Sequence, residues 1–202
     1  MIKTIIFDLG NVIINVDHRS ICGKIAKHSK YTADDIYRIG FNSQEFKLYD
    51  EGKIESEELF QWVVKRFGID ISYDIFQGIW SETFSLNDSV YLLLKELKKR
   101  GYNLILLSNT NELHFDHIKI NFGVIDAFDD LVLSYRLGYS KPHEEVYTEV
   151  LRRATSPAED CVYIDDMGKF CEAAEKSGIK SITYRSTQQL ITELKGLGVT
   201  LG

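Results

Sequence analysis

The sequence predicts an α/β fold, a doubly wound, mostly parallel, Rossmann-like sheet with a helical cap inserted after the first strand. Two patterns lead to this prediction. Short and nearly continuous apolar runs recur along the chain, as expected for strands that helices cover on both faces. From residue 87 onward these runs alternate with amphipathic helical segments, whereas residues 17–84 are helix-like throughout, with no strand pattern.

The first predicted strand lies in "IKTIIFDLGNVII", residues 2–14. Its apolar run ends at Asp8, and Gly10 and Asn11 precede a second apolar run. Glycine at this point is expected to let the backbone turn tightly, so that a main-chain carbonyl and N–H groups can face a ligand.

The helix-like segments of residues 17–84 carry apolar side chains at helical spacing. Clear examples are Leu59, Trp62, Val63 and Phe67. Such aromatic stripes are typical of a hydrophobic core rather than of a cofactor site. Residues 41–54 include turn residues, so this segment could place Lys47 and Tyr49 near a substrate. The alternative is that both residues lie on a solvated helix face.

The other predicted strands are residues 103–108, 130–134, 161–165 and 180–184. One helix is expected to begin at Asn87 or Asp88 and to stop at Gly101, after basic residues in its last turn. A second should begin at Pro142, because proline favours the first helical position. Two more should end near Gly178 and Gly196.

These elements predict two domains. Residues 1–16 and 85–202 would form the α/β core, which is the catalytic domain, and residues 17–84 would form the helical cap. The chain has only two prolines and no low-complexity linker. The cap is therefore expected to be an insertion with short hinges rather than a flexibly tethered unit.

Composition restricts the class of protein. The 202 residues are 44% hydrophobic and 27% charged, with a formal net charge of −6. Nothing in this balance attracts nucleic acid or an anionic membrane, so neither is expected as a partner. Three cysteines without paired spacing suit a reducing compartment, and no segment predicts a signal peptide or a membrane span. A cytoplasmic location is expected.

Polar side chains follow the predicted strands at the edge where open α/β sheets bind ligands. They are Asp8, Ser108, Asn109, Lys141, Asp165 and Asp166. Taken singly, each could cap a turn or a helix or lie on the surface. The adjacent carboxylates Asp165 and Asp166 would repel one another unless a cation were nearby.

The chemistry of this set points to phosphoryl transfer. Oxygen ligands without histidine or cysteine suit a hard cation such as Mg²⁺. A magnesium ion, a lysine and a hydroxyl together can neutralise a phosphoryl group. A free carboxylate facing them can attack phosphorus and form an aspartyl-phosphate.

With these residues in place, the chain resembles the haloacid dehalogenase superfamily over essentially its full length. "IIFDLGNVI" is similar to the first motif of that superfamily, "LLSNTN" to the second, Lys141 in "GYSKPHEEVY" to the third and "VYIDDMGKFCEAA" to the fourth. The helical insertion resembles its small cap. The FDLGNV motif resembles a subgroup of small phosphatases that includes a sugar-phosphate phosphatase acting on α-glucose 1-phosphate.

The resemblance implies a role for each residue. Asp8 would be the nucleophile and a Mg²⁺ ligand, and the Gly10 carbonyl would also face the metal. Ser108, helped by the Asn109 backbone, would bind the phosphoryl group, and Lys141 would neutralise both nucleophile and phosphate. Asp166 would bind the metal directly, while Asp165 would support it, either directly or through water.

Two positions depart from the superfamily pattern. Most phosphatases of this superfamily have a second aspartate, a general acid, where this chain has Gly10. General acid–base catalysis contributes typically ~10²–10⁴-fold, so turnover should be slower. Phe170 stands where a polar residue often braces the lysine or a metal-bound water, which puts that bracing in question.

The predicted function is a Mg²⁺-dependent phosphatase acting on a small phosphorylated metabolite, which could be a sugar phosphate. Gly10 and Phe170 motivate an alternative, a catalytically weak protein that binds or senses a metabolite. Dehalogenation of 2-haloacids is a further alternative, because dehalogenases of the superfamily also lack the second aspartate. They need no metal, however, and the Asp165–Asp166 pair indicates one.

Overall fold

Five parallel strands form the central sheet of the computed structural model, which describes residues 1–81 and 84–202. Their order across the sheet is β5-β4-β1-β6-β7. The bounds are Thr4–Phe7 (β1), Asn103–Ser108 (β4), Asp130–Leu133 (β5), Cys161–Asp165 (β6) and Lys180–Thr183 (β7). All four pairings are parallel. The predicted α/β sheet is therefore confirmed, and each expected strand is present to within a residue or two.

Alternation along the strands divides the core between the two faces of the sheet. Ile5 and Phe7 of β1 pack into one hydrophobic cluster with α6, α7 and α11. Ile6, between them, packs into another with α9 and α10. The helices span Asp88–Lys99 (α6), Glu112–Phe122 (α7), Glu144–Arg153 (α9), Gly168–Lys176 (α10) and Thr187–Gly196 (α11). Burial on both faces explains why the strands are continuous apolar runs.

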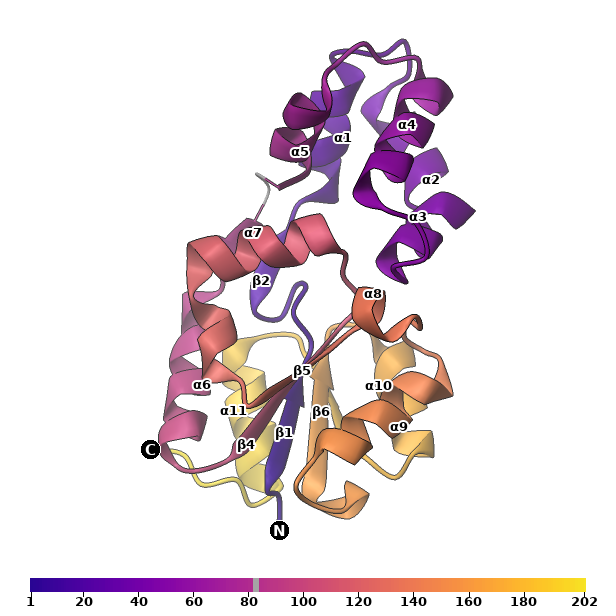
Figure 1. Cartoon of the computed structure of the whole chain (residues 1–202). Helices are drawn as coiled ribbons and strands as arrows, with labels where there is room; N and C mark the ends of the chain where they lie inside the picture. The colour runs from indigo at the N-terminus through magenta and orange to yellow at the C-terminus, as the bar shows by residue number, and fades with distance from the viewer. Residues whose placement is uncertain (82–83) are drawn as a thin grey trace.

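Residues 17–81 form a separate helical unit above the carboxyl edge of the sheet (Figure 1). Its helices are His18–Ala26 (α1), Ala33–Gly40 (α2), Gln44–Asp50 (α3), Ser56–Phe67 (α4) and Tyr73–Ser81 (α5). Their apolar side chains share one cluster of their own. We propose the predicted ranges, 1–16 with 85–202 and 17–84, as the two domains, because their hydrophobic cores are separate.

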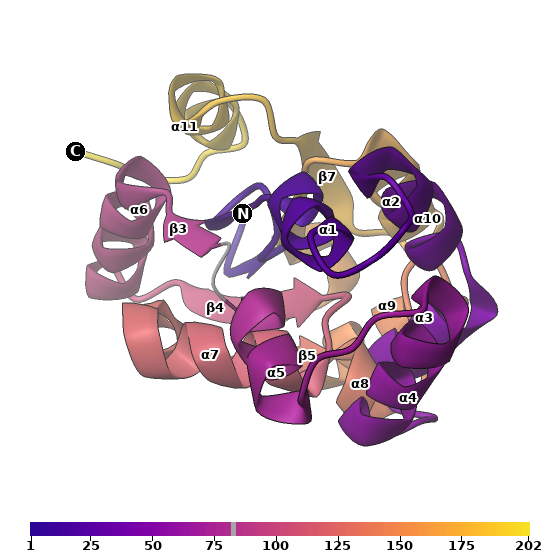
Figure 2. The ribbon, with the colours of Figure 1, turned by 90° about the horizontal axis from the view of Figure 1, so that it is seen from above.

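A short antiparallel ribbon joins the two units and was not predicted. Ile14–Val16 (β2) pairs with Phe84–Leu86 (β3). The proposed cap range ends at residue 84, which is the first residue of β3 and not part of a helix. Residues 82–83, which were also assigned to the cap, lie outside the described residues. Seen from above, α1 and α5 lie side by side where the chain enters and leaves the cap (Figure 2).

Two details of the third crossover differ from the prediction. Pro142 does not begin a helix: it lies in a turn, and α9 begins only at Glu144. A short helix, Ser134–Leu137 (α8), directly follows β5 instead. Both features lie where the core meets α3 of the cap, so they shape the site rather than the sheet.

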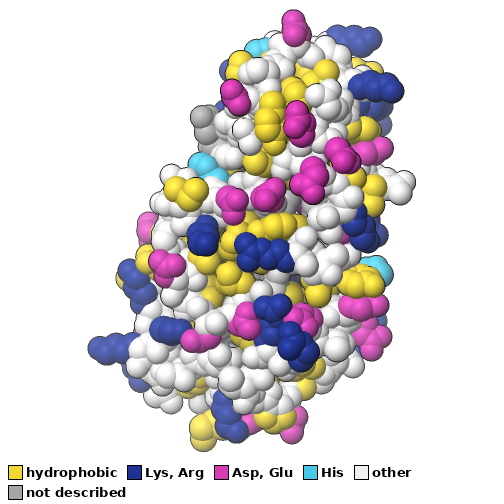
Figure 3. All heavy atoms as spheres, in the orientation of Figure 1, with side chains coloured by type: hydrophobic (Ala, Val, Ile, Leu, Met, Phe, Trp, Pro, Cys, Tyr) yellow, Lys and Arg dark blue, Asp and Glu magenta, His cyan; other side chains and the backbone are white. Residues whose placement is uncertain are grey.

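No helix of the described residues is long and apolar enough to cross a membrane. The three cysteines are buried free thiols. The face drawn in Figure 3 mixes acidic and basic side chains, with carboxylates gathered along the level where cap and core meet. This face is not the uniformly basic surface that would attract nucleic acid.

Candidate active site

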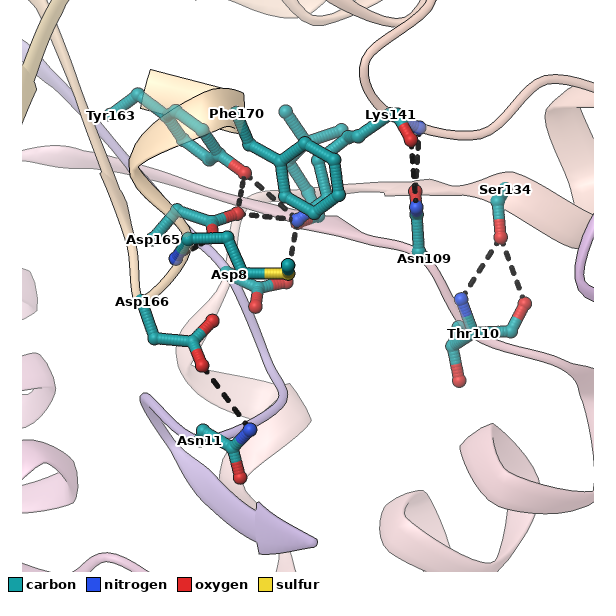
Figure 4. A network of polar contacts seen from close by, with 12 residues as sticks. Asp8, Asn11, Asn109, Thr110, Ser134, Lys141, Tyr163, Asp165, Asp166 and Phe170 are labelled. Atoms are coloured by element: carbon teal, nitrogen blue, oxygen red, sulfur yellow. Dashed lines mark hydrogen bonds and ion pairs between the residues drawn. The ribbon is translucent and has the colours of Figure 1, made fainter. Parts of the chain in front are cut away.

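The carboxyl edge of the sheet brings the predicted residues together. Asp8 follows β1, and its backbone N–H donates to the Ile164 carbonyl of β6, 2.8 Å away. This pairing sets Asp8 beside Asp165 and Asp166 at the end of β6. Lys141 arrives from the loop after α8 and points its ammonium group at the same spot (Figure 4).

The Lys141 ammonium group is the centre of a buried network. Its Nζ donates to Asp8 Oδ1 at 2.8 Å, to Asp165 Oδ2 at 2.7 Å and to the Tyr163 hydroxyl at 2.8 Å. Tyr163 in turn donates its hydroxyl proton to Asp165 Oδ2. The Lys141 side chain is 1% exposed, so these charged contacts are shielded from water.

Burial and charge oppose one another in this network. Burial raises the pKa of Asp8 to about 7, while Lys141 pulls it down and Asp165 adds to the rise. Burial lowers the pKa of Lys141, but the two carboxylates outweigh it and the net shift is upward. Burial also raises the pKa of Asp166. The lysine thus remains a cation, and the surplus of carboxylates favours a further cation.

The donor set fits a magnesium ion. Carboxylate oxygens of Asp8, Asp165 and Asp166 all lie within 4.8 Å of one another. Asp165 is already occupied, because Oδ1 accepts from the Met167 N–H at 2.7 Å and Oδ2 contacts Lys141 and Tyr163. Asp166 is freer, since its Oδ2 contacts the Asn11 amide at 3.2 Å. Hard carboxylate oxygens of this kind are the ligands that Mg²⁺ prefers.

The backbone after Asp8 differs from the expectation for Gly10. Asn11, not Gly10, adopts the left-handed conformation, with a φ of 53°. Asparagine tolerates this region better than most residues. A Cβ atom at Gly10 would meet only Val16 Cγ2, at 3.8 Å, an ordinary contact. The tight turn therefore does not require glycine at position 10.

Ser108 and Asn109 lie at the end of β4, as predicted. Ser108 is buried and lines a cavity of about 250 Å³ together with Asp8, Gly10 and Lys141. The Asn109 side chain instead holds the Lys141 backbone, accepting from its N–H at 2.7 Å and donating to its carbonyl at 3.1 Å. Asn109 thus fixes the loop that carries the lysine.

The two cap candidates have different surroundings. Lys47 lines a larger cavity of about 710 Å³ that also reaches Asn109, Lys141 and Phe170. Tyr49 does not reach either of these two cavities, because it is buried in the cap core with its hydroxyl 2.7 Å from Ser56 Oγ. This corrects the expectation for Tyr49, both as a substrate contact and as part of a solvated face.

The cap segment after Tyr49 is docked on the core. The Asp50 carbonyl accepts from Ser134 Oγ at 2.5 Å, and Glu51 Oε1 accepts from Ser140 Oγ at 2.7 Å. Asp50 also lines the 710 Å³ cavity, and burial raises its pKa to about 6. Ser140 immediately precedes Lys141, so this cap segment contacts the loop that carries the lysine.

Two buried polar side chains near the site were not recognised from the sequence. Tyr163 was read only as part of an apolar strand, although its position two residues before Asp165 puts both side chains on one face of β6. His114 is also buried, where it stacks on Trp80 and lines the 250 Å³ cavity. Burial lowers the pKa of His114 to about 3.

Comparison with known proteins gives a family match along most of the chain. Residues 2–178 match the family of haloacid dehalogenase-like hydrolases. Among curated proteins, D-ribitol-5-phosphate phosphatase of Bacteroides thetaiotaomicron is 26% identical over 176 residues, covering 82% of this chain and 84% of the relative. The sesquiterpene phosphatase AstK of Aspergillus oryzae is 24% identical over 197 residues, covering 96% of each.

A solved structure is similar over nearly the same extent. A HAD family enzyme from Bacteroides thetaiotaomicron, in complex with magnesium and inorganic phosphate, superimposes with a TM-score of 0.82 and 26% sequence identity. The alignment covers 92% of this chain and 95% of that one. Both the sheet and the helical cap are therefore shared.

Proposed function

The chain belongs to the haloacid dehalogenase-like hydrolases, and from this membership and the geometry around Asp8 we propose that it is a Mg²⁺-dependent phosphatase. Its substrate would be a small phosphorylated metabolite, and the reaction would pass through an aspartyl-phosphate on Asp8. A sugar or polyol phosphate is the substrate class we favour.

One observation carries the proposal, the buried contact between Lys141 and the carboxylates of Asp8 and Asp165, with Asp166 close by. A structural ion pair would need one carboxylate for one lysine. Here two carboxylates contact a single lysine and a third lies within 4.8 Å of them, at the edge of the sheet where α/β folds bind ligands. This excess suits a site that also takes up a cation and then an anionic phosphoryl group.

Asp8, Asp166 and the Gly10 carbonyl would hold the Mg²⁺ ion, with Asp165 in support. When bound, magnesium would neutralise charge on the transferring phosphoryl group and keep Asp8 ionised. The proposal for Asp165 follows from its contacts, because both of its oxygens already accept hydrogen bonds from protein groups.

The reaction then uses residues of this chain. Ser108 and the Asn109 backbone would bind the phosphoryl group, and Lys141 would neutralise it together with Asp8. Asp8 attacks phosphorus, so that one Asp8 O–P bond forms while the bond to the leaving oxygen breaks. That oxygen takes a proton from water, since Gly10 supplies none. A second water, deprotonated by the hydroxide that the first water leaves, then attacks the aspartyl-phosphate, so that its Asp8 O–P bond breaks and inorganic phosphate and free Asp8 are released.

Two relatives suggest different leaving groups, a polyol and a sesquiterpene alcohol. The 710 Å³ cavity favours the polyol or sugar, because Lys47, Asp50, Ser140 and His143 give its wall many polar and charged groups. A long apolar chain would bury these groups without hydrogen-bond partners, which is costly. Lys47 is the cap residue we propose to contact the substrate.

The test is turnover of sugar phosphates, polyol phosphates and p-nitrophenyl phosphate, with and without Mg²⁺. The control is Asp8→Asn, which keeps the size of the side chain and removes the nucleophile. We expect phosphate release that requires Mg²⁺ and is lost in the variant. Release equal to that of Asp8→Asn would refute the proposal.

Two further measurements, of metabolite binding and of halide release, separate the alternatives from the proposal. Tight binding of a phosphorylated metabolite without turnover would indicate a binding or sensing protein. Halide release from 2-haloacids without added metal would indicate a dehalogenase. Either result would replace the phosphatase proposal rather than refine it.

A further inference from the structure

The ammonium group of Lys141 is enclosed by aromatic side chains as well as by carboxylates. The Phe170 ring centroid lies 5.0 Å from Nζ, and the Tyr163 ring centroid lies 5.5 Å away. We call Tyr163 and Phe170 the aromatic cage. Position 170 is the one where a polar brace was expected, so something else must hold the lysine in place.

Tyr163 provides the polar part of the cage. Its side chain is fully buried on β6, and its hydroxyl accepts from Lys141 while donating to Asp165. The short hydrogen bonds of the Lys141 ammonium group go to Asp8, Asp165 and Tyr163, and a longer one of 3.4 Å reaches the Leu107 carbonyl. The hydroxyl therefore fixes both the direction of the ammonium group and the rotamer of Asp165.

Phe170 provides the apolar part. Its ring lies over the ammonium group in Figure 4, and Phe170 lines both cavities beside Lys141, whose side chain is only 1% exposed. Its backbone carbonyl accepts from the buried Tyr147 hydroxyl at 3.0 Å, which fixes the start of α10. A cation over a ring face is attracted by the ring, and exclusion of water strengthens the nearby ion pairs.

We infer that Tyr163 and Phe170 are the positioning residues of Lys141, which hold its ammonium group between Asp8 and the phosphoryl group. This inference rests on the proposed function, because it assigns Lys141 to the transition state. Neither residue is expected to touch the substrate through its own polar atoms. Their contribution is the fixed geometry of the lysine.

Two variants test the cage by kinetics. Tyr163→Phe keeps the ring and removes the hydroxyl, and Phe170→Leu keeps apolar bulk and removes the ring face. We expect Tyr163→Phe to lower kcat by ~10–100-fold, with KM for p-nitrophenyl phosphate nearly unchanged. For Phe170→Leu the expected decrease is roughly 2–30-fold, the range of a cation–π contact. Wild-type kcat in Tyr163→Phe would overturn the inference.

A second readout does not depend on catalysis. Acetic anhydride labelling, resolved by mass spectrometry, measures how often each lysine amine reaches solvent, and exposed Lys98 is the internal reference. We expect Lys141 to react faster in both variants than in the wild type. The matched control is Tyr184→Phe, which removes a half-buried hydroxyl bonded to Asn87 and should leave Lys141 protected.

Unchanged labelling of Lys141 in Tyr163→Phe would overturn the inference. An equal increase in the Lys141 labelling rate in Tyr184→Phe would also overturn it, because the increase would then reflect a non-specific loss of packing. If the wild-type protein shows no turnover, the proposed function fails, and the labelling alone then decides whether the cage holds Lys141. The two failures are therefore distinguishable.

Discussion

At the scale of single residues, Gly10 leaves room in the wall of the 250 Å³ cavity that contains Asp8. A side chain would fit there, since a Cβ atom would meet only Val16 at an ordinary distance. We predict that Gly10→Asp folds and raises kcat on sugar or polyol phosphates, by up to ~10²-fold, by giving the leaving oxygen a proton. Turnover of p-nitrophenyl phosphate should change little, because its leaving group needs no proton.

The control for this prediction is Gly10→Asn, which has nearly the same size and no acidic proton. Rates on the two substrate types, measured for both variants at saturating Mg²⁺, decide the outcome. An equal gain with aspartate and asparagine would point to packing rather than proton transfer. No gain with aspartate would mean that another group already protonates the leaving oxygen.

His114 supports a prediction about pH and stability. Burial lowers its pKa to about 3, against about 6.5 in the unfolded chain. The unfolded state therefore binds the proton more readily, and the stability from neutral His114 is present above about pH 6.5 and is lost as pH falls toward 3. Between about pH 7.5 and pH 5 this loss should reach about 2 kcal/mol.

His114→Phe should remove that loss while keeping a ring stacked on Trp80. Urea unfolding of the wild type and the variant at the two pH values gives the comparison. Asp8 and Asp50 have raised pKa values in the folded state, so their protonation stabilises the folded chain as pH falls. This opposite contribution is the same in the wild type and the variant, and it cancels in the comparison. The same pH dependence in wild type and variant would contradict the assignment of this proton to His114.

The residues of the site were predictable where position along a strand decides their location. Asp8, Ser108, Asp165 and Asp166 come at strand ends, and parallel strands bring their carboxyl ends to one edge. Tyr163 was missed because an aromatic ring is common in a buried strand. Nothing in the strand pattern indicates that its hydroxyl contacts Lys141 and Asp165. Tyr49 was misplaced because the sequence pattern of α3 does not say which face of the helix meets the cap core.

At the scale of elements, the contact between cap and core depends on Gly52. Its φ is +62°, and a Cβ atom there would lie 2.0 Å from the Tyr135 carbonyl oxygen of α8. Gly52→Ala must therefore move the loop that carries Asp50 and Glu51 away from the core. We predict a loss of stability greater than ~1 kcal/mol and a raised KM, because the wall of the 710 Å³ cavity shifts.

Gly68 offers a matched control for Gly52. Its φ is +61°, and a Cβ atom there would meet nothing within 4 Å, so Gly68→Ala carries the backbone strain without the clash. Urea unfolding and steady-state kinetics on both variants separate the two effects. Equal losses of stability with an unchanged KM in both would show that the docked loop does not shape the substrate cavity.

Elements were predictable where local sequence decides them. The five sheet strands are continuous apolar runs because helices cover both of their faces. The β2–β3 ribbon pairs residues about seventy positions apart over only three residues, so no local pattern marks it. The start of α9 at Glu144 departs from the preference of Pro142 for a helix start. The turn of α8 begins at Ser134, whose hydroxyl donates to the Asp50 carbonyl of the cap, a long-range contact that no local pattern marks.

At the scale of the whole molecule, the excess of carboxylates at the edge of the sheet should make stability depend on Mg²⁺. Asp8, Asp165 and Asp166 lie within 4.8 Å of one another in the folded chain, with one lysine in contact with two of them, and they separate on unfolding. A cation that binds only the folded state stabilises it by about 2.7 kcal/mol at a concentration a hundred times its Kd. For a chain of this length that corresponds to a rise of roughly 5–10 °C in Tm.

Thermal unfolding with and without Mg²⁺, at constant ionic strength adjusted with NaCl, measures this rise. Asp166→Asn should abolish it, because the freest carboxylate of the three is lost. The exposed carboxylate Asp34 gives the matched control, since Asp34→Asn removes an equal charge from the cap surface and should keep the full rise. A rise that persists in Asp166→Asn would place the cation elsewhere, and the absence of a rise in the wild type would remove the metal from the proposed mechanism.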